Sequence, residues 1–396
     1  MQAPEEGKTH PSRGVFLSLR DDDNNHDSEG HHQRKEKKME KSRRMMKGFV
    51  LFLSFSLMAG FLAFTPVTGL AKPVTLRLAH SEALTNIRHD VCLFFVKRAN
   101  ELSKGEVKID IFPAGAMGSH QACQQQVATG VLDFYITTAG LVSTFDPTRI
   151  QELIELPYLF DNYSQAYAFM DTPYVAKFYD PLKAKGIHYL ATWDNGFRHL
   201  TNNVRPVNIP QDMKGLKIRV VQSEMSINIL QALGASAVPM GYAELYQAMQ
   251  QKVVDGQENP FMNIYASKFY EVQKYMSLTK HQYSTLPIII SEMTWQKLDA
   301  NQQNAIQKAA EEAAPYFRKL VGANEDGQRK EMEKAGMKVN DVKDLAPFRK
   351  AQEPVYEWAK KKWGADKVTE LLAEVEKTRK MYPIGGKAYF GPADAK

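Results

Sequence analysis

The chain has 396 residues, 43% hydrophobic and 24% charged, enough to form one large or two medium domains with a substantial core. Residues 1–71 hold 11 of the 51 basic and 9 of the 45 acidic side chains, so the formal net charge of +6 falls to +4 beyond them. This balance is too mild to indicate nucleic-acid binding, and it suits a small anionic ligand.

The first 38 residues carry charge runs, at 21–23 and 34–38, and few apolar side chains. Such a segment cannot bury enough apolar surface to offset the entropy lost on ordering. We therefore predict that residues 1–38 are disordered, or are a leader from an over-extended gene start.

Residues 39–71 have the layout of a secretory signal peptide. Lys41, Arg43 and Arg44 precede an uncharged, mainly apolar run that ends in Gly-Leu-Ala. This predicts cleavage before Lys72 and a periplasmic mature protein without stable membrane insertion. A permanent membrane anchor is the alternative, but the apolar run is shorter than the ~20 residues that a bilayer requires.

The mature chain begins with a β-α-β-α-β pattern. An alternating strand at 74–79 is followed by apolar residues at helical spacing from Val91 to Leu102, and a second strand alternates over 107–111. Ser119 caps a helix that ends at Gly130, and residues 132–137 form a third strand. The pattern indicates the start of a doubly wound α/β lobe.

A second α/β lobe begins near Gly196. Strands are predicted at 187–192, 216–221 and 235–238, with a helix opened by Ser223 and closed by Gly234, and another at 242–252.

The C-terminal part is mainly helical. A buried strand at 287–290 precedes a helical pattern that reaches about Lys334, in which Pro315 should cause a kink or split the helix in two. Cys92 and Cys123 fall in different predicted helices and are predicted to be buried free thiols, although export would allow a disulfide.

No enzyme signature is found: there is no phosphate-binding glycine loop, no His-Glu-x-x-His and no Gly-x-Ser-x-Gly. The histidines are not at metal-ligand spacing. We predict a protein that is not an enzyme and uses no metal or other cofactor.

Arg219 is the most informative residue, because it lies in the apolar strand LKIRVV at 216–221 with no acidic residue within three positions. A buried guanidinium stays charged and needs an anionic partner. That partner is a ligand carboxylate or, alternatively, a distant acid such as Asp255 or Glu258. Asn259 follows an apolar pair at a turn, where its amide contacts a ligand or stabilises the turn.

Several segments resemble the DctP-type extracytoplasmic solute receptors of TRAP (tripartite ATP-independent periplasmic) transporters. They follow the family's order over essentially all of residues 72–396: FPAGAMG at 112–118, ELPYLF at 155–160, NGFR at 195–198, MKGLKIRV at 213–220, VDGQENP at 254–260 and KFYEVQKY at 268–275.

The resemblance implies roles for particular residues. It implies that Arg219 clamps a ligand carboxylate, that Arg198 and Asn259 are further ligand contacts, and that Tyr242 lines the pocket with its hydroxyl as a polar handle.

The first lobe departs from the sialic-acid receptors of this family. Residues 137–141 read TTAGL, where those receptors carry acidic and basic pocket residues, so sialic acid is not the expected ligand. We include Thr138 among the ligand-binding residues. His80 and His120 are placed to hydrogen-bond the far end of a ligand, or are structural histidines.

The resemblance also implies the fold and the function. We expect a two-lobed α/β fold of the periplasmic-binding-protein type, with a ligand cleft between the lobes and long C-terminal helices. Lobe one would comprise residues 72–195 plus 285–322, and lobe two residues 196–284 plus 323–396. The function implied is a periplasmic receptor that delivers a monocarboxylate, dicarboxylate or sugar acid to the membrane subunits of a TRAP transporter. A sensor-input receptor for an organic acid is the alternative, and a secreted enzyme acting on an organic acid is a more distant one.

Overall fold

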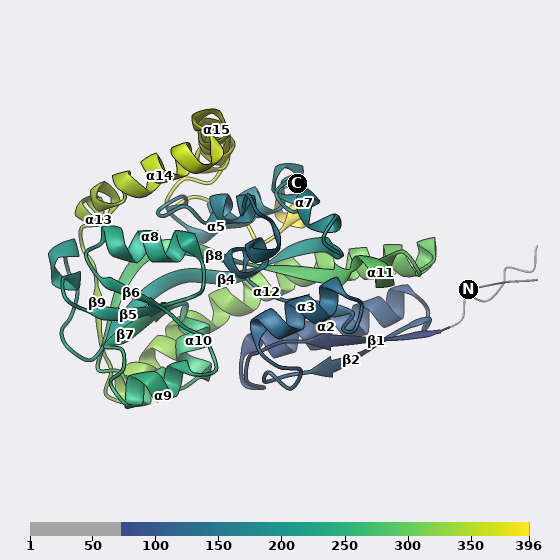
Figure 1. The fold of residues 1–396 in the computed structure, drawn as a ribbon, viewed down its shortest axis with the longest axis horizontal. Helices are drawn as coiled ribbons and strands as arrows, with labels where there is room; N and C mark the ends of the chain where they lie inside the picture. The colour runs from purple at the N-terminus through teal and green to yellow at the C-terminus, as the bar shows by residue number, and fades with distance from the viewer. Residues whose placement is uncertain (1–72, 396) are drawn as a thin grey trace, which may run out of the picture. The chain divides into compact units, whose positions relative to one another are not determined.

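The structure is a computed structural model that describes residues 73–395, drawn as the coloured ribbon in Figure 1. The predicted leader at residues 1–38 and the predicted signal peptide at residues 39–71 lie outside the described residues, so both stay predictions. Within residues 73–395, no helix has the length and apolar character that crossing a membrane requires.

The described residues form one mixed sheet of nine strands, in the order β2-β1-β3-β8-β4-β7-β5-β6, with β9 paired to β8. β1 is parallel to β2 and β3, and β5 is parallel to β6 and β7. Two parallel groups are thus joined at the centre by the antiparallel pair β4 and β8. The strands are β1 (Val74–Ala79), β2 (Val107–Phe112), β3 (Phe134–Ile136), β4 (Ile187–Asn202), β5 (Lys217–Val220), β6 (Ser236–Pro239), β7 (Gly256–Asn259), β8 (Tyr275–Ser291) and β9 (Lys338–Asp341).

The N-terminal lobe contains β1–β3 with helices α2 (Ile87–Leu102) and α3 (His120–Ala128), which confirms the predicted β-α-β-α-β order. The hydroxyl of Ser119 accepts a hydrogen bond from the N–H of Ala122, so the predicted cap of α3 is also confirmed. Cys92 and Cys123 are buried in these two helices as free thiols.

The second lobe contains β5–β7 with α8 (Glu224–Ala232), α9 (Leu245–Gln250) and α10 (Phe261–Ala266). Ser223 caps α8, as predicted, by accepting from the N–H of Ser226. Gly256 opens β7 where an added Cβ would lie only 1.9 Å from the carbonyl oxygen of Thr201. Only glycine therefore lets β7 approach β4 here, which explains this glycine of the VDGQENP segment.

The two central strands are much longer than the predicted strands at 187–192 and 287–290. β4 has 16 residues and β8 has 17, and they run through both lobes. The prediction was too short because the continuing residues are mainly polar, among them Asp194, Arg198 and His281, yet all three are buried. Asp194 accepts from Tyr167 and Tyr283, and Arg198 and His281 both contact Glu258, so these polar side chains are buried with partners and interrupt the apolar alternation that predicts a strand.

Helix α12 (Ala300–Lys334) is one helix of 35 residues that contains Pro315, so a split is wrong, while the alternative that was predicted, a kink, stays a prediction. It packs on α2 of the N-terminal lobe and on α10 and β9 at its other end (Figure 1). Its buried face includes Ala310, Ala314 and Phe317 on either side of the proline. Packing of this face outweighs the interior proline, which costs ~3 kcal/mol.

The C-terminal helices α13 (Ala346–Ala351), α14 (Glu353–Trp363) and α15 (Ala365–Met381) pack on both lobes, α14 on α8 and α15 on α5. The predicted lobe boundaries stay a prediction.

The remaining described elements are α4 (Ala139–Val142), η1 (Ser143–Phe145), η2 (Ile150–Glu155), α5 (Tyr163–Met170), α6 (Pro173–Ala176), α7 (Asp180–Lys183), η3 (Pro210–Met213), η4 (Phe269–Glu271), α11 (Glu292–Trp295) and η5 (Pro392–Ala395).

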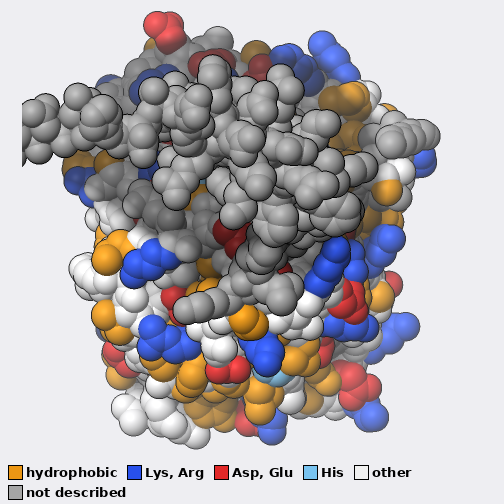
Figure 2. Space-filling model, turned by 90° about the vertical axis from the view of Figure 1, so that its right-hand side faces the viewer, with side chains coloured by type: hydrophobic (Ala, Val, Ile, Leu, Met, Phe, Trp, Pro, Cys, Tyr) orange, Lys and Arg blue, Asp and Glu red, His pale blue; other side chains and the backbone are white. Residues whose placement is uncertain are grey.

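The face of the molecule seen in Figure 2 carries Lys and Arg side chains interspersed with Asp and Glu and with hydrophobic side chains. This mixture agrees with the mild net charge of the sequence.

Candidate functional site

A cavity of about 530 Å³ lies between the two lobes. The N-terminal lobe contributes the residues that follow β1 and β3 and the start of α3, and the second lobe contributes those at and beyond the ends of β5, β6 and β7. Ligands of open α/β sheets bind at this edge, beyond the carboxyl ends of the strands. Six of the seven predicted site residues line it: Arg219, Arg198, Asn259, Tyr242, Thr138 and His120.

Arg219 lies on β5 and is only 2% exposed. Its Nε and Nη2 donate to the carbonyl oxygen of Met240, at 3.0 and 2.7 Å, while Nη1 has no partner among the described residues. Burial lowers the pKa of Arg219 to about 10, against the opposing charge of Glu258, so the guanidinium stays charged at neutral pH. The site therefore holds a buried cation with an unused donor.

The internal salt bridge considered for Arg219 is not formed. The carboxylate of Asp255 instead accepts from the backbone N–H of Lys217, at 2.8 Å, and Glu258 pairs with Arg198. No described carboxylate forms an ion pair with Arg219, so its charge is not neutralised by a direct partner.

Tyr242 lies beside this guanidinium, with its ring centroid 5.8 Å from the Cζ of Arg219. Its hydroxyl bonds the hydroxyl of Ser267, at 2.7 Å. The predicted polar handle is thus already engaged, and Tyr242 presents its ring to the cation.

Arg198, on β4, is buried and occupied mainly by Glu258. Its Nη2 lies 2.9 Å from Glu258 Oε1 and its Nε contacts Oε2. Burial raises the pKa of Glu258, but the charge of Arg198 and hydrogen bonds from His281 and Arg198 outweigh this and lower it to about 2. Arg198 is therefore neutralised within the protein, in contrast to Arg219.

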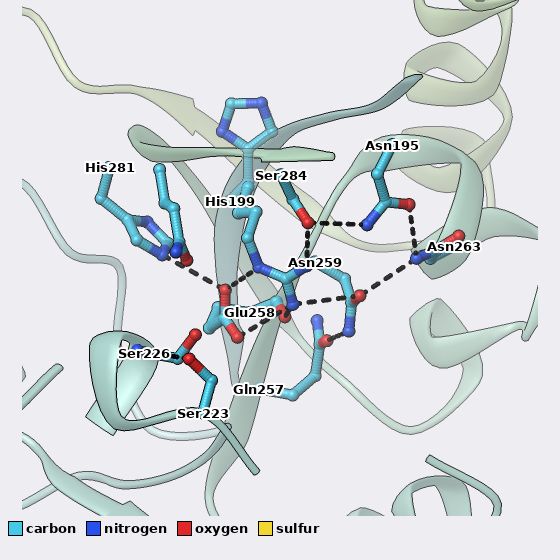
Figure 3. A network of polar contacts seen from close by, with 12 residues as sticks. Asn195, His199, Ser223, Ser226, Gln257, Glu258, Asn259, Asn263, His281 and Ser284 are labelled. Atoms are coloured by element: carbon cyan, nitrogen blue, oxygen red, sulfur yellow. Dashed lines mark hydrogen bonds and ion pairs between the residues drawn. The ribbon is translucent and has the colours of Figure 1, made fainter. Parts of the chain in front are cut away.

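Three amide side chains continue this network towards the N-terminal lobe (Figure 3). Asn259 Oδ1 accepts from Asn263 Nδ2 at 3.1 Å, and Asn263 Nδ2 also lies 3.4 Å from Asn195 Oδ1. Asn86, which caps α2, donates to Asn263 Oδ1 at 3.2 Å. Asn195 and Asn263 line the cavity, and sequence reasoning missed both because only the fold brings them to Asn259.

Glu82 and Arg88 form a second buried ion pair in the cavity wall, which sequence reasoning also missed. Arg88 Nη1 donates to Glu82 Oε1 at 2.8 Å, and Arg88 Nη2 donates to Asn195 Oδ1 at 3.1 Å. Glu82 Oε2 and Arg88 Nε have no partner among the described residues. Burial raises the pKa of Glu82, but the charge of Arg88, together with His120 and the hydrogen bond from Ser81, outweighs it and the pKa lies below its usual range. The signal available was an acidic residue just beyond the end of the first strand.

Of the remaining predicted site residues, His120 and Thr138 line the cavity and His80 does not. His120 lines the cavity with its Nδ1 2.8 Å from the hydroxyl of Tyr135, and burial lowers its pKa to about 4, so it is neutral at pH 7. Thr138 lines the cavity too, but its hydroxyl caps α4. His80 is not among the lining residues; it is fully buried with its Nε2 3.1 Å from His89 Nδ1.

At the rim of the cavity, the side-chain amide of Gln121 on α3 donates to that of Gln222, which follows β5. The two lobes are thus in direct contact across the cavity. Among residues 73–393, whose side chains are described, no group of three or more His, Cys, Asp or Glu is arranged to hold a metal ion.

Comparisons with known proteins agree with this architecture. Residues 78–362 match the family model described as bacterial extracellular solute-binding protein, family 7. The chain is 34% identical over 297 residues to the 2,3-diketo-L-gulonate-binding periplasmic protein YiaO of Escherichia coli, covering 74% of this chain and 88% of that protein. It is 32% identical over 300 residues to the sialic acid-binding periplasmic protein SiaP of Vibrio cholerae, covering 76% and 92%.

A solved structure has the same fold. The sugar acid binding protein DctPAm from Advenella mimigardefordensis, in complex with galactonate, superposes with a TM-score of 0.74 at 30% identity, covering 78% of this chain and 99% of that chain. The predicted two-lobed α/β class is thereby confirmed. Proteins of this family are extracytoplasmic receptors that bind ligands for transport and are not enzymes. The chain belongs to the bacterial extracellular solute-binding protein family 7, the family of the DctP-type receptors that its motifs predicted.

Proposed function

We propose that this protein is a periplasmic receptor that binds an organic acid in the cavity between its lobes and delivers it to the membrane subunits of a TRAP transporter. The observation that carries the proposal is Arg219, a buried cation in the cavity wall that has neither a carboxylate partner nor a partner for its Nη1 within residues 73–395.

The physical argument rests on the cost of that arrangement. Keeping an ion away from water costs several kcal/mol unless a counter-charge with good hydrogen-bond geometry meets it. A ligand carboxylate supplies both, because the planar guanidinium can donate to its oxygens while Nε and Nη2 remain on Met240.

The similar proteins support an acid as ligand. The ligands named for them are 2,3-diketo-L-gulonate, sialic acid and galactonate, and each of these molecules carries a carboxylate. For this chain sialic acid is the least favoured, because residues 137–141 offer no charged side chain to the cavity.

Delivery and location follow from the family and the N-terminal sequence. The signal peptide at residues 39–71 would export the chain, and closure of the predicted lobes, 72–195 plus 285–322 and 196–284 plus 323–396, would trap the ligand. Small-angle scattering with and without saturating ligand tests closure: we expect a smaller radius of gyration with ligand, and an unchanged radius counts against trapping.

Binding is tested by a thermal-shift screen of organic acids, with neutral sugars as matched controls. A ligand at about 100 times its dissociation constant should stabilise the protein by about 2.7 kcal/mol. We expect shifts from acids and none from neutral sugars. A screen in which neutral sugars shift the melting temperature and acids do not would refute the proposal.

A further inference from the structure

The cavity carries enough charge and hydrogen-bonding detail to narrow the class of acid. We infer that the ligand is a hydroxylated monocarboxylate, with its single carboxylate on Arg219 and a hydroxyl between Glu82 and Arg88, and that dicarboxylates are disfavoured. This inference rests on the proposed function, because it concerns the same cavity.

The charge of the ligand is inferred by counting the buried positive and negative side chains at the cavity. Three arginines line it, and two of them are already paired, Arg88 with Glu82 and Arg198 with Glu258. All three guanidinium groups and both carboxylates are buried. Glu244 also lines the cavity but is exposed to solvent, so among the buried ions described one unmatched positive charge remains, on Arg219, and one carboxylate balances it.

A second carboxylate would add a negative charge that no described residue of the cavity wall is free to neutralise. Arg198 could neutralise it only by giving up Glu258, which would leave a buried carboxylate unpaired, and the free Nε of Arg88 could meet it only beside the like charge of Glu82. Such an exchange is strongly unfavourable in a desolvated site.

That the ligand carries a hydroxyl is inferred from the atoms of the Glu82–Arg88 pair that have no hydrogen-bond partner. Glu82 Oε1 already accepts from Arg88 Nη1 and from the hydroxyl of Ser81, at 2.8 and 3.1 Å, whereas Oε2 has no partner among the described residues. An ionised carboxylate is only an acceptor, so the ligand group that meets Oε2 must donate.

Arg88, in contrast, requires a ligand group that accepts a hydrogen bond. Its Nη1 and Nη2 are occupied by Glu82 and Asn195, but its Nε has no described partner and can only donate. A hydroxyl satisfies both residues, because it donates to Glu82 and accepts from Arg88. A carboxylate satisfies Arg88 alone and faces Glu82 with like charge, and a methylene satisfies neither.

The direct test is calorimetry on the purified protein with acids that separate the requirement for a hydroxyl from the requirement for a single carboxylate. The panel comprises aldonates of four to six carbons (hydroxyls, one carboxylate), hexanoate (no hydroxyl, one carboxylate), succinate (no hydroxyl, two carboxylates) and glucarate (hydroxyls, two carboxylates). We expect the best aldonate to bind at least roughly 100-fold tighter than the other three, because unpaired buried polar groups reject an analogue strongly.

The outcomes separate this inference from the proposed function. Succinate, glucarate or hexanoate binding within threefold of the best aldonate overturns the hydroxy-monocarboxylate inference and leaves the organic-acid receptor intact. If no acid of any class binds, the proposed function falls and the inference falls with it.

A variant test uses Glu82→Gln, which keeps the shape of the side chain and removes its charge. Arg88 then becomes a second unmatched cation, so the preference for aldonate over glucarate should fall at least tenfold. Glu292→Gln is the matched control, because Glu292 is a buried carboxylate outside the cavity, 2.9 Å from His188. It should leave the preference unchanged. An unchanged preference in a folded Glu82→Gln protein refutes the role of Glu82, and if that variant does not fold, the acid panel on the wild type decides.

Discussion

Replacing Arg219 by lysine separates the geometry of the guanidinium from its charge. The guanidinium makes two hydrogen bonds to the carbonyl oxygen of Met240, and its Nη1 has no partner among the described residues. An ammonium keeps the positive charge but lacks the planar fork, so it cannot hold Met240 and both oxygens of a carboxylate at once.

The expected loss can be worked from these contacts. Removing one partner of a buried charge pair costs about 2–5 kcal/mol. Since the charge remains, we expect the lower part of that range, about 2–3 kcal/mol, and the dissociation constant should rise by roughly 30- to 150-fold. Losing one bond to Met240 should lower the free energy of unfolding by only about 1–2 kcal/mol.

Calorimetry with the best acid of the screen measures the affinity, and urea denaturation measures the stability. Arg318→Lys is the matched control, since Arg318 is a buried arginine outside the cavity, paired with both oxygens of Asp171 at 2.7 and 2.8 Å. It should lose stability and keep its affinity. If Arg219→Lys binds the acid within twofold of wild type, the carboxylate clamp is wrong.

Three further predictions concern the surroundings of the clamp. Glu258→Gln removes the partner of Arg198 from a fully buried pair, so urea denaturation should show a loss of about 3–5 kcal/mol; a loss below 1 kcal/mol would contradict the pairing. Burial lowers the pKa of His80 to about 4, so between pH 6.5 and 4 the unfolded chain binds a proton that the folded chain does not. The free energy of unfolding of the wild type should therefore fall by up to roughly 1.4 kcal/mol per pH unit more than that of His80→Gln on acidification through this window. Urea denaturation of both proteins at pH 7 and pH 5 measures this difference, and an equal loss of stability in the two proteins would exclude the effect. Gln222→Ala removes the contact with Gln121 between the lobes, which should raise the ligand dissociation rate about 2- to 10-fold in stopped-flow fluorescence; an unchanged rate would show that the contact does not retain ligand.

The lack of an acidic partner for Arg219 was accessible to sequence reasoning because its signal is local. Arg219 stands in an apolar strand without a nearby acid, and the structure leaves it without one. The Glu82–Arg88 pair was not accessible, because its meaning depends on which atoms remain unpaired after folding. His80 follows the first strand as expected of a site residue, but its ring turns to His89 of α2 and lies outside the lining.

The order of helices and strands was predictable where apolar residues alternate or recur, as in β1, α2 and α8. The centre of the sheet was not, because β4 and β8 bury polar side chains whose partners lie elsewhere in the sequence, such as Arg198 of β4 with Glu258 of β7. Pro315 misled for a related reason: a local preference against helix was outweighed by the tertiary packing of α12.

The path of the chain through the sheet has a consequence for how the protein acquires its structure. β3 forms its ladder with residues 288–290 of β8, more than a hundred positions later, and α12 then covers α2. The N-terminal lobe therefore cannot bury its core until β8 and most of α12 are available, and neither lobe can fold as a finished unit during synthesis. Non-local pairing of this kind slows folding. A nascent chain that reaches only residue 270 should accordingly stay protease-sensitive and open to chaperones, the condition that a polypeptide needs if it is to be threaded through a membrane before it folds.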